Sequence, residues 1–183
     1  MFIVFEGVDA VGKTTVARLL ANRLGGGTYY ATPPSSFLAE RERVDLSASP
    51  DDHYRFYLHG IHQASREIWA LLASGKTVVG DRYWASTYVY HEVMGAAVAE
   101  RDFDHIVLPD LTVLLSVTSE EQALRFEQRG MSAGDRRMFN DQVQLARAFR
   151  KFFTIRPTRL VAIDTTYLAP AEVVAQVVAE AIT

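Results

Sequence analysis

The segment that most constrains this chain is the glycine-rich loop GVDAVGKT at residues 7–14. It matches the pattern G-x-x-x-x-G-K-[ST], in which backbone N–H groups turn inward around phosphate oxygens. An apolar run at residues 2–5 predicts a buried strand before the loop, and a helical period of apolar residues begins at Thr14. The loop therefore lies at the positive end of a helix dipole, where anions bind. The sequence predicts that this loop binds a nucleoside triphosphate.

The loop residues have separable expected tasks. Lys13 is expected to reach the terminal phosphates, and the Thr14 hydroxyl to complete a Mg²⁺ shell. The other loop residues expected to bind ATP are Gly7, Val8, Asp9, Ala10, Val11, Gly12 and Thr15. GTPases, motors and kinases all use such a loop, but the guanine-recognition motif N-K-x-D does not occur in this sequence, which weighs against a GTPase.

Composition sets the broad class of protein. A chain of 183 residues fits one compact domain spanning residues 1–183. The net charge of −3 provides no basic field for non-specific nucleic-acid binding. There is no cysteine, and hence no disulfide or thiolate site, which fits a cytoplasmic protein. We find neither a signal-peptide pattern nor an apolar run near the roughly 18 residues that cross a bilayer, so no membrane partner is expected.

Apolar periodicity predicts alternating strands and helices along the chain. Further strands are expected at residues 28–31, 77–81, 111–117 and 160–163, and helices at residues 14–24, 55–73, 138–153 and from 170 onward. Ser119 and Gln122 suggest a capping box that begins another helix. This alternation predicts an α/β fold with a five-stranded parallel sheet and helices on both faces. Ligands bind such sheets beyond the carboxyl ends of the strands.

A second polar group follows one of these strand ends. Asp81 closes the strand at residues 77–81, which we expect beside the first strand, so its carboxylate would face the Mg²⁺ and phosphate site together with Thr14. Arg82 would place its guanidinium against the transferring or acceptor phosphate. Phosphoryl transfer depends mainly on positioning and charge neutralisation, so this acid and arginine are the expected parts.

Both segments resemble the thymidylate kinase family. The stretch FEGVDAVGKTT has the family's Glu-Gly after the strand and its acid within the loop. The stretch DRYWASTYVYH is similar to D-R-[YH]-x-x-S-x-x-A-Y-Q, matching it at Asp81, Arg82, Tyr83, Ser86 and Tyr90 and departing from it at Val89 and His91. The resemblance implies a P-loop kinase fold, ATP as phosphate donor, Mg²⁺ and a homodimer. It also implies that Asp9 contacts the acceptor sugar, although an Asx turn that shapes the loop is an alternative role.

The expected acceptor pocket departs from the family at two places. Phe56 falls at the base-stacking aromatic, with packing against a neighbouring helix as the alternative, but Gly60 stands where the family has a base-recognising arginine. The stretch YATPPSSF also lacks the family's phosphate-binding arginine, for which Arg41, Arg43 or Arg66 could substitute. The residues expected to bind the acceptor are Asp9, Phe56, Gly60, Arg82, Tyr83, Ser86 and Tyr90, with core packing as the alternative for the tyrosines.

An arginine-rich segment at residues 125–137 resembles the mobile lid of nucleotide kinases. Arg125, Arg129, Arg136 and Arg137 surround Gly130 and Gly134. Closure of a lid would exclude water and bring an arginine to the developing charge. Because the variable loop positions Ala10 and Val11 are not basic, the resemblance implies that the lid supplies this arginine. Arg129 is the first candidate and Arg136 the second, and Arg125 and Arg136 are also expected to bind ATP; a solvated basic turn is the alternative.

Together these features predict an ATP- and Mg²⁺-dependent nucleoside monophosphate kinase. The acceptor phosphate would attack the γ-phosphorus in line, with Lys13, Asp81, Arg82 and Arg129 as the catalytic residues. A deoxynucleoside kinase, or a kinase of a modified nucleotide, is an alternative favoured by the two missing arginines. A nucleotide-binding regulator without catalysis is a third hypothesis, and the intact motif residues argue against it.

Overall fold

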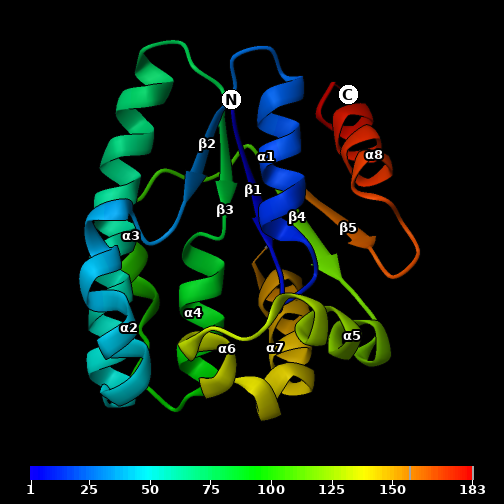
Figure 1. Cartoon of the computed structure of the whole chain (residues 1–183). Coiled ribbons are helices and arrows are strands. Elements are labelled where there is room, and N and C mark those ends of the chain that lie inside the picture. Colours follow the sequence, from blue (N-terminus) through cyan, green and yellow to red (C-terminus); the bar gives the residue numbers. More distant parts are fainter. Residues whose placement is uncertain (157, 183) are drawn as a thin grey trace.

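Five parallel strands form one sheet at the centre of the computed structural model, which describes residues 1–156 and 158–182 (Figure 1). Their order across the sheet is β2-β3-β1-β4-β5. The strands are β1 (Phe2–Glu6), β2 (Thr28–Ala31), β3 (Val78–Asp81), β4 (Leu111–Ser116) and β5 (Leu160–Asp164). The expected parallel α/β architecture is confirmed, and each predicted strand is present within one residue of its expected ends.

The register of the central strands places the two sequence motifs side by side. In the parallel pairing of β1 with β3, Phe5 lies opposite Asp81. The loop that follows β1 and the Asp-Arg pair at the end of β3 therefore leave the same edge of the sheet at neighbouring positions. The expected adjacency of these two strands is confirmed.

Helices cover both faces of the sheet. They are α1 (Lys13–Arg23), α2 (Leu38–Ser47), α3 (Pro50–Ala73), α4 (Trp84–Val93), α5 (Ser119–Arg129), α6 (Ala133–Arg137), α7 (Gln142–Ile155) and α8 (Pro170–Ile182), with short 3₁₀ turns between some of them. Side chains of β1 alternate between two buried clusters: Ile3 packs in the cluster that contains Leu20 of α1, and Val4 in the cluster that contains Ile61 of α3. This period of two explains why β1 is apolar at each position from Phe2 to Phe5.

Several helix ends differ from the expected ones. Thr118, not Ser119, is the N-cap of α5, and its hydroxyl accepts a hydrogen bond from the N–H of Glu121. The expected helix at residues 138–153 begins only at Gln142, after a 3₁₀ turn. Helix α3 begins at Pro50 rather than at residue 55, because Ser49 caps it and proline is favourable in a first turn.

Helices α2 and α4, which the sequence analysis did not predict, border the site. Helix α2 is mostly polar and buries only Val44 and Asp45, so it has no apolar stripe. Helix α4 begins three residues after Asp81 and carries the second motif, and it packs on both α3 and α7. None of the helices in the described residues is long and apolar enough to span a membrane.

Candidate active site

The glycine loop between β1 and α1 packs so tightly that it requires glycine at its first position. Gly7 has φ +133°, and a Cβ atom there would lie 2.3 Å from the carbonyl oxygen of Leu115 on β4. Gly12 has φ +94° and immediately precedes α1. Lys13 is buried, and its ammonium donates a short hydrogen bond to the carbonyl of Val8, across the mouth of the loop. In this structure the Lys13 side chain therefore folds back onto the backbone of its own loop.

Asp81 and Thr14 meet at the end of β3. The Thr14 hydroxyl donates to Oδ2 of Asp81 at 2.5 Å, and the Tyr29 hydroxyl donates to the same oxygen at 2.9 Å. A carboxylate and a hydroxyl converging beside a phosphate loop are hard oxygen ligands of the kind that Mg²⁺ takes alongside water and nucleotide phosphates. The residues present therefore fit the expected metal. Tyr29 is a supporting residue that the sequence analysis missed.

Arg82 connects the loop to α4. Its Nη1 donates to the carbonyl of Gly7 at 3.1 Å and to the Ser86 hydroxyl at 3.2 Å, and its Nη2 donates a short hydrogen bond to Asp9. The residue has φ +65°, a left-handed conformation that costs free energy for a non-glycine residue and is common at functional sites. The Tyr90 hydroxyl donates to Asp9 at 2.9 Å. Asp9 of the glycine loop and Arg82, Ser86 and Tyr90 of the second motif therefore form one cluster.

Two glutamines for which the sequence analysis predicted no role at the site hold Asp9 from behind. Gln142, on α7, accepts from the N–H of Asp9 at 3.2 Å and donates to its carboxylate at 3.2 Å. Gln122, on α5, donates to the carbonyl of Asp9 at 2.7 Å and to Gln142 at 2.9 Å. This network fixes both the backbone and the side chain of Asp9. An Asx turn is therefore not needed to explain its orientation.

Burial and opposite charges shift the protonation equilibria of this cluster. Burial, with a further contribution from Arg82, lowers the pKa of Lys13 to about 7. Burial alone would raise the pKa of Asp9, but Arg82 and Lys13 outweigh it and hold that pKa below its usual value. Burial raises the pKa of Glu6, which is fully enclosed and accepts hydrogen bonds from Tyr83 and Ser86. Asp9 is therefore ionised at neutral pH and a weak base.

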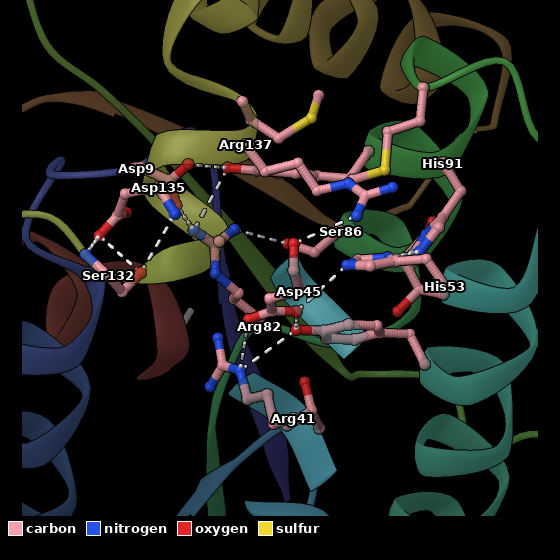
Figure 2. A pocket seen from close by; sticks show the side chains of 17 residues that line it. Asp9, Arg41, Asp45, His53, Arg82, Ser86, His91, Ser132, Asp135 and Arg137 are labelled. Atoms are coloured by element: carbon pink, nitrogen blue, oxygen red, sulfur yellow. Dashed lines mark hydrogen bonds and ion pairs between the residues drawn. The ribbon is translucent and has the colours of Figure 1, made fainter. Parts of the chain in front are cut away.

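A cleft of about 720 Å³ opens in front of the glycine loop. Its lining includes Ala10, Gly12, Lys13, Thr14, Thr15, Tyr29, Asp81, Arg125, Gln128 and Arg129. A second, smaller cavity lies between α2, α3, α4 and α6 and is lined by His53, Tyr57, Thr87, Tyr90, His91, Met94, Gly134, Arg137 and Met138, among others (Figure 2). Both cavities are lined by Asp9, Thr32, Arg41, Arg82, Ser132 and Asp135. The shared residues make these two cavities neighbours.

The second cavity has a polar wall that the sequence analysis did not predict. The carboxylate of Asp45, on α2, accepts from the Tyr57 hydroxyl at 2.8 Å and lies 3.4 Å from Nε of Arg41. It also lies 3.1 Å from Nε2 of His53, whose Nδ1 is 2.8 Å from Nε2 of His91. Figure 2 shows Asp45 between Arg41 and His53. His53 and Tyr57 lie one turn apart on α3, so their i, i+4 spacing was the available signal.

The arginines of residues 125–137 have different surroundings. Arg125 donates to the carbonyl oxygens of Ala10 and Thr165, and Arg129 pairs with Asp135 at 2.9 Å; both line the 720 Å³ cleft. Arg136 instead is exposed, donates to the carbonyl of Met131 and lines neither of the two cavities. The expectation that Arg136 lies at the triphosphate site is not met in this conformation, because its side chain turns back along its own segment.

Three predicted acceptor residues lie outside the second cavity. Phe56 packs edge-on against Phe37, with the ring centroids 5.2 Å apart, and Gly60 lies against Pro33. Tyr83 is fully buried against Phe2 in the core. The face of α3 that borders the cavity is the neighbouring one, which carries His53 and Tyr57. For Phe56 and Tyr83 the structure shows the alternative role, which is packing against other side chains. Of the three substitute arginines, only Arg41 lines the cavity; Arg43 and Arg66 are exposed elsewhere.

Comparison with known proteins identifies relatives over nearly the whole chain. The thymidylate kinase family model matches residues 5–177. A thymidylate kinase of Mycoplasma mobile is 30% identical over 176 residues, which cover 85% of this chain and 83% of the relative. One of Chlamydia caviae is 34% identical over 149 residues, which cover 70% of this chain and 72% of the relative.

Solved structures agree on the fold. A thymidylate kinase of Candida albicans has a TM-score of 0.79 at 19% identity, covering 97% of this chain and 89% of that chain. One of Ehrlichia chaffeensis has a TM-score of 0.72 at 23% identity, covering 100% of this chain and 98% of that chain. The family match, the phosphate-binding loop and the adjacent Asp-Arg pair lead to the same conclusion: the chain belongs to the thymidylate kinase family and is a nucleoside monophosphate kinase.

Proposed function

We propose that this enzyme transfers the γ-phosphoryl group of ATP to the phosphate of thymidylate, or of a closely related deoxynucleoside monophosphate. The observation that carries the choice of acceptor is the position of Arg41. Arg41 and Arg82 are the two arginines that line both cavities, and a phosphate between a donor in one and an acceptor in the other would lie beside them. Arginine is suited to binding phosphate oxygens with two parallel hydrogen bonds.

The same region is poorly suited to a nucleoside acceptor. A free hydroxyl is a weak nucleophile that benefits from a nearby general base, whereas a phosphate oxygen needs only neutralising cations. Asp9 is held ionised with a lowered pKa, and Glu6 is enclosed and lines neither cavity. Neither Asp9 nor Glu6 is therefore a suitable base for the deoxynucleoside kinase alternative.

In the proposed mechanism each residue has one task. Lys13 binds the terminal phosphates of ATP after it exchanges its contact with Val8 for phosphate oxygens. Thr14 and Asp81 would hold Mg²⁺, which supplies charge neutralisation to the β- and γ-phosphates when it is bound. Arg41 and Arg82 orient the acceptor phosphate for in-line attack, and Asp9 accepts a hydrogen bond from the acceptor sugar. No covalent enzyme intermediate is required.

The segment at residues 125–137 is proposed to act as the lid, with Arg129 neutralising the transferring group. Arg129 already lines the donor cleft, and its pairing with Asp135 keeps it within the segment until a phosphate competes for it. We also propose that the enzyme is a cytoplasmic homodimer, as the family resemblance and the cysteine-free composition suggest.

A coupled assay of ADP release over a panel of acceptors tests the proposal. Thymidine and dTMP form the matched pair, because they differ only in the 5′-phosphate. We expect turnover with dTMP, dependence on Mg²⁺, and no turnover with thymidine. Turnover of thymidine but not of dTMP would establish the nucleoside kinase alternative, and binding of ATP without turnover of any acceptor would establish a regulator.

A further inference from the structure

The second cavity, which we propose as the acceptor site and call the acceptor cavity, contains an arginine that forms no ion pair with a carboxylate in the described part of the chain. Arg41 is paired with Asp45 and Arg82 with Asp9. Arg137, on α6, forms no ion pair there; it donates from Nη1 to the carbonyl of Asp45 at 3.1 Å and from Nη2 to the carbonyl of Ala48 at 2.8 Å. In Figure 2, Arg137 and Arg41 approach the cavity from opposite sides. Arg137 therefore brings an unpaired positive charge to the cavity wall.

Helix α3 cannot supply a base-recognising side chain at Gly60. A Cβ atom there would lie 3.0 Å from Cβ of Pro33 and 3.7 Å from the ring of Phe37. A proline ring is rigid, so an arginine at this position would require the turn at residues 32–34 to move. Recognition of the acceptor base must therefore come from a position other than Gly60.

The two histidines of the cavity are already occupied. His53 contacts Asp45 through Nε2 and His91 through Nδ1. Nδ1 of His91 lies 2.5 Å from the carbonyl of Thr87. All four ring nitrogens therefore have partners within the protein. Thr87 also lines this region, but its hydroxyl can donate or accept and so does not select between bases.

Arg137 is the remaining group with a fixed preference. A guanidinium has five N–H donors and no acceptor, and Arg137 donates only two of them to α2. We propose that Arg137 is a specificity-determining residue that donates a hydrogen bond to a ring carbonyl of the acceptor base. It would favour bases with a carbonyl at that edge, such as thymine or uracil, over cytosine, whose amino group would face another donor. This inference rests on the proposed function of the cavity as the acceptor site.

The proposal has a structural consequence for the lid. Arg137 belongs to residues 125–137 and is held against the C-terminal end of α2. The base-recognising group would therefore reach the cavity only when this segment is docked on α2. Selection of the acceptor and closure over ATP would then be one event.

Deoxyuridine and deoxycytidine monophosphates provide the test, since their rings differ at position 4, where one carries a carbonyl and the other an amino group. We would measure kcat/KM for both with the unmodified enzyme, Arg137→Gln and the matched control Arg136→Gln. Loss of a hydrogen bond to a charged donor predicts that Arg137→Gln lowers the dUMP/dCMP ratio by at least about tenfold. Arg136→Gln should leave the ratio unchanged, because that side chain lines neither cavity.

Two outcomes would overturn the inference. Either the unmodified enzyme uses dUMP and dCMP equally, or Arg137→Gln lowers both by the same factor, as expected of a residue that only fastens the lid. If circular dichroism shows that Arg137→Gln does not fold, Arg137→Lys provides the same comparison with the charge retained and the paired geometry lost. If only nucleosides are turned over, the proposed function fails, and the same ratio is then measured with deoxyuridine and deoxycytidine.

Discussion

Replacement of Arg41 by methionine tests how the acceptor phosphate is held. The substitution keeps an unbranched apolar chain about as long as the aliphatic part of arginine and removes the guanidinium with its charge. A hydrogen bond to a charged group contributes about 1.5–3 kcal/mol, which corresponds to about ten- to 150-fold in binding. Because the Arg41 side chain is 39% exposed, we expect the lower end of that range, about a tenfold increase in KM for dTMP.

The fold should tolerate this change. Asp45 keeps its hydrogen bond from Tyr57 and its contact with His53, so it is not left unpaired when Arg41 is replaced. We expect the free energy of unfolding to change by less than about 1 kcal/mol, as for other partly exposed ion pairs. Urea denaturation would establish this before the kinetics are interpreted.

The assay measures initial rates of ADP release while dTMP is varied at saturating ATP, and then while ATP is varied at saturating dTMP. Arg43→Met is the matched control, because Arg43 is on the same helix, has a 73% exposed side chain and, within the described residues, forms an ion pair only with Glu40, at 3.9 Å. It should leave both KM values within about twofold. An unchanged KM for dTMP in Arg41→Met, or equal increases in KM for dTMP and ATP, would refute the phosphate-binding role of Arg41.

Three further predictions concern the donor side of the site. The pKa of Lys13 is about 7 in the free protein, and an anionic triphosphate favours the ammonium form. ATP binding at pH 8 should therefore take up about 0.9 proton, and the affinity for ATP should fall as pH rises above 7. Calorimetry in buffers of different ionisation enthalpy would detect this uptake, and uptake that persists in Lys13→Arg would contradict the prediction. Arg129→Ala should lower kcat more than it raises KM for ATP, whereas equal losses in steady-state kinetics would mean that Arg129 acts only in binding. Gly7→Ala should lower the free energy of unfolding by about 2–4 kcal/mol and Gly12→Ala by about 1–2 kcal/mol. Both positions have positive φ, but only an alanine at position 7 would also clash with Leu115. Similar losses for the two variants in urea denaturation would show that the clash is unimportant.

The sequence was sufficient where local pattern and topology determine the result. The glycine loop and the Asp-Arg pair each follow an apolar strand, and the rules for parallel sheets place such ends at one edge. That reasoning correctly brought Asp9, Asp81 and Arg82 close to the loop lysine. Contacts between the two segments, such as that of Thr14 with Asp81, follow from the register of β1 with β3, which brings the ends of these strands together.

Sequence pattern did not predict which face of helix α3 lines the cavity. Sequence period assigned Phe56 and Gly60 to the pocket face of α3, whereas the structure places His53 and Tyr57 there. The difference arises because the segment at residues 33–37 packs on Phe56 and Gly60, whereas the polar helix α2 contacts the cavity face of α3 through Asp45. Asp45 of α2 could not be assigned a role before its partners were known.

Supporting residues were missed for a related reason. Gln122 and Gln142 contact Asp9 from helices more than 100 residues away in the chain. Neutral amides have no distinctive sequence signal, so only the tertiary contact identifies them. Tyr83 is the opposite case: it belongs to a recognisable motif, yet its ring completes the core beneath the site instead of lining it.

A crystal structure with a non-hydrolysable ATP analogue, Mg²⁺ and dTMP bound together would test the central claim most directly. We expect the γ-phosphate to lie within hydrogen-bonding distance of Lys13 and Arg82, and the phosphate of dTMP to lie between Arg41 and Arg82. A dTMP phosphate bound away from both arginines, or a γ-phosphate remote from Asp81 and Arg82, would contradict it.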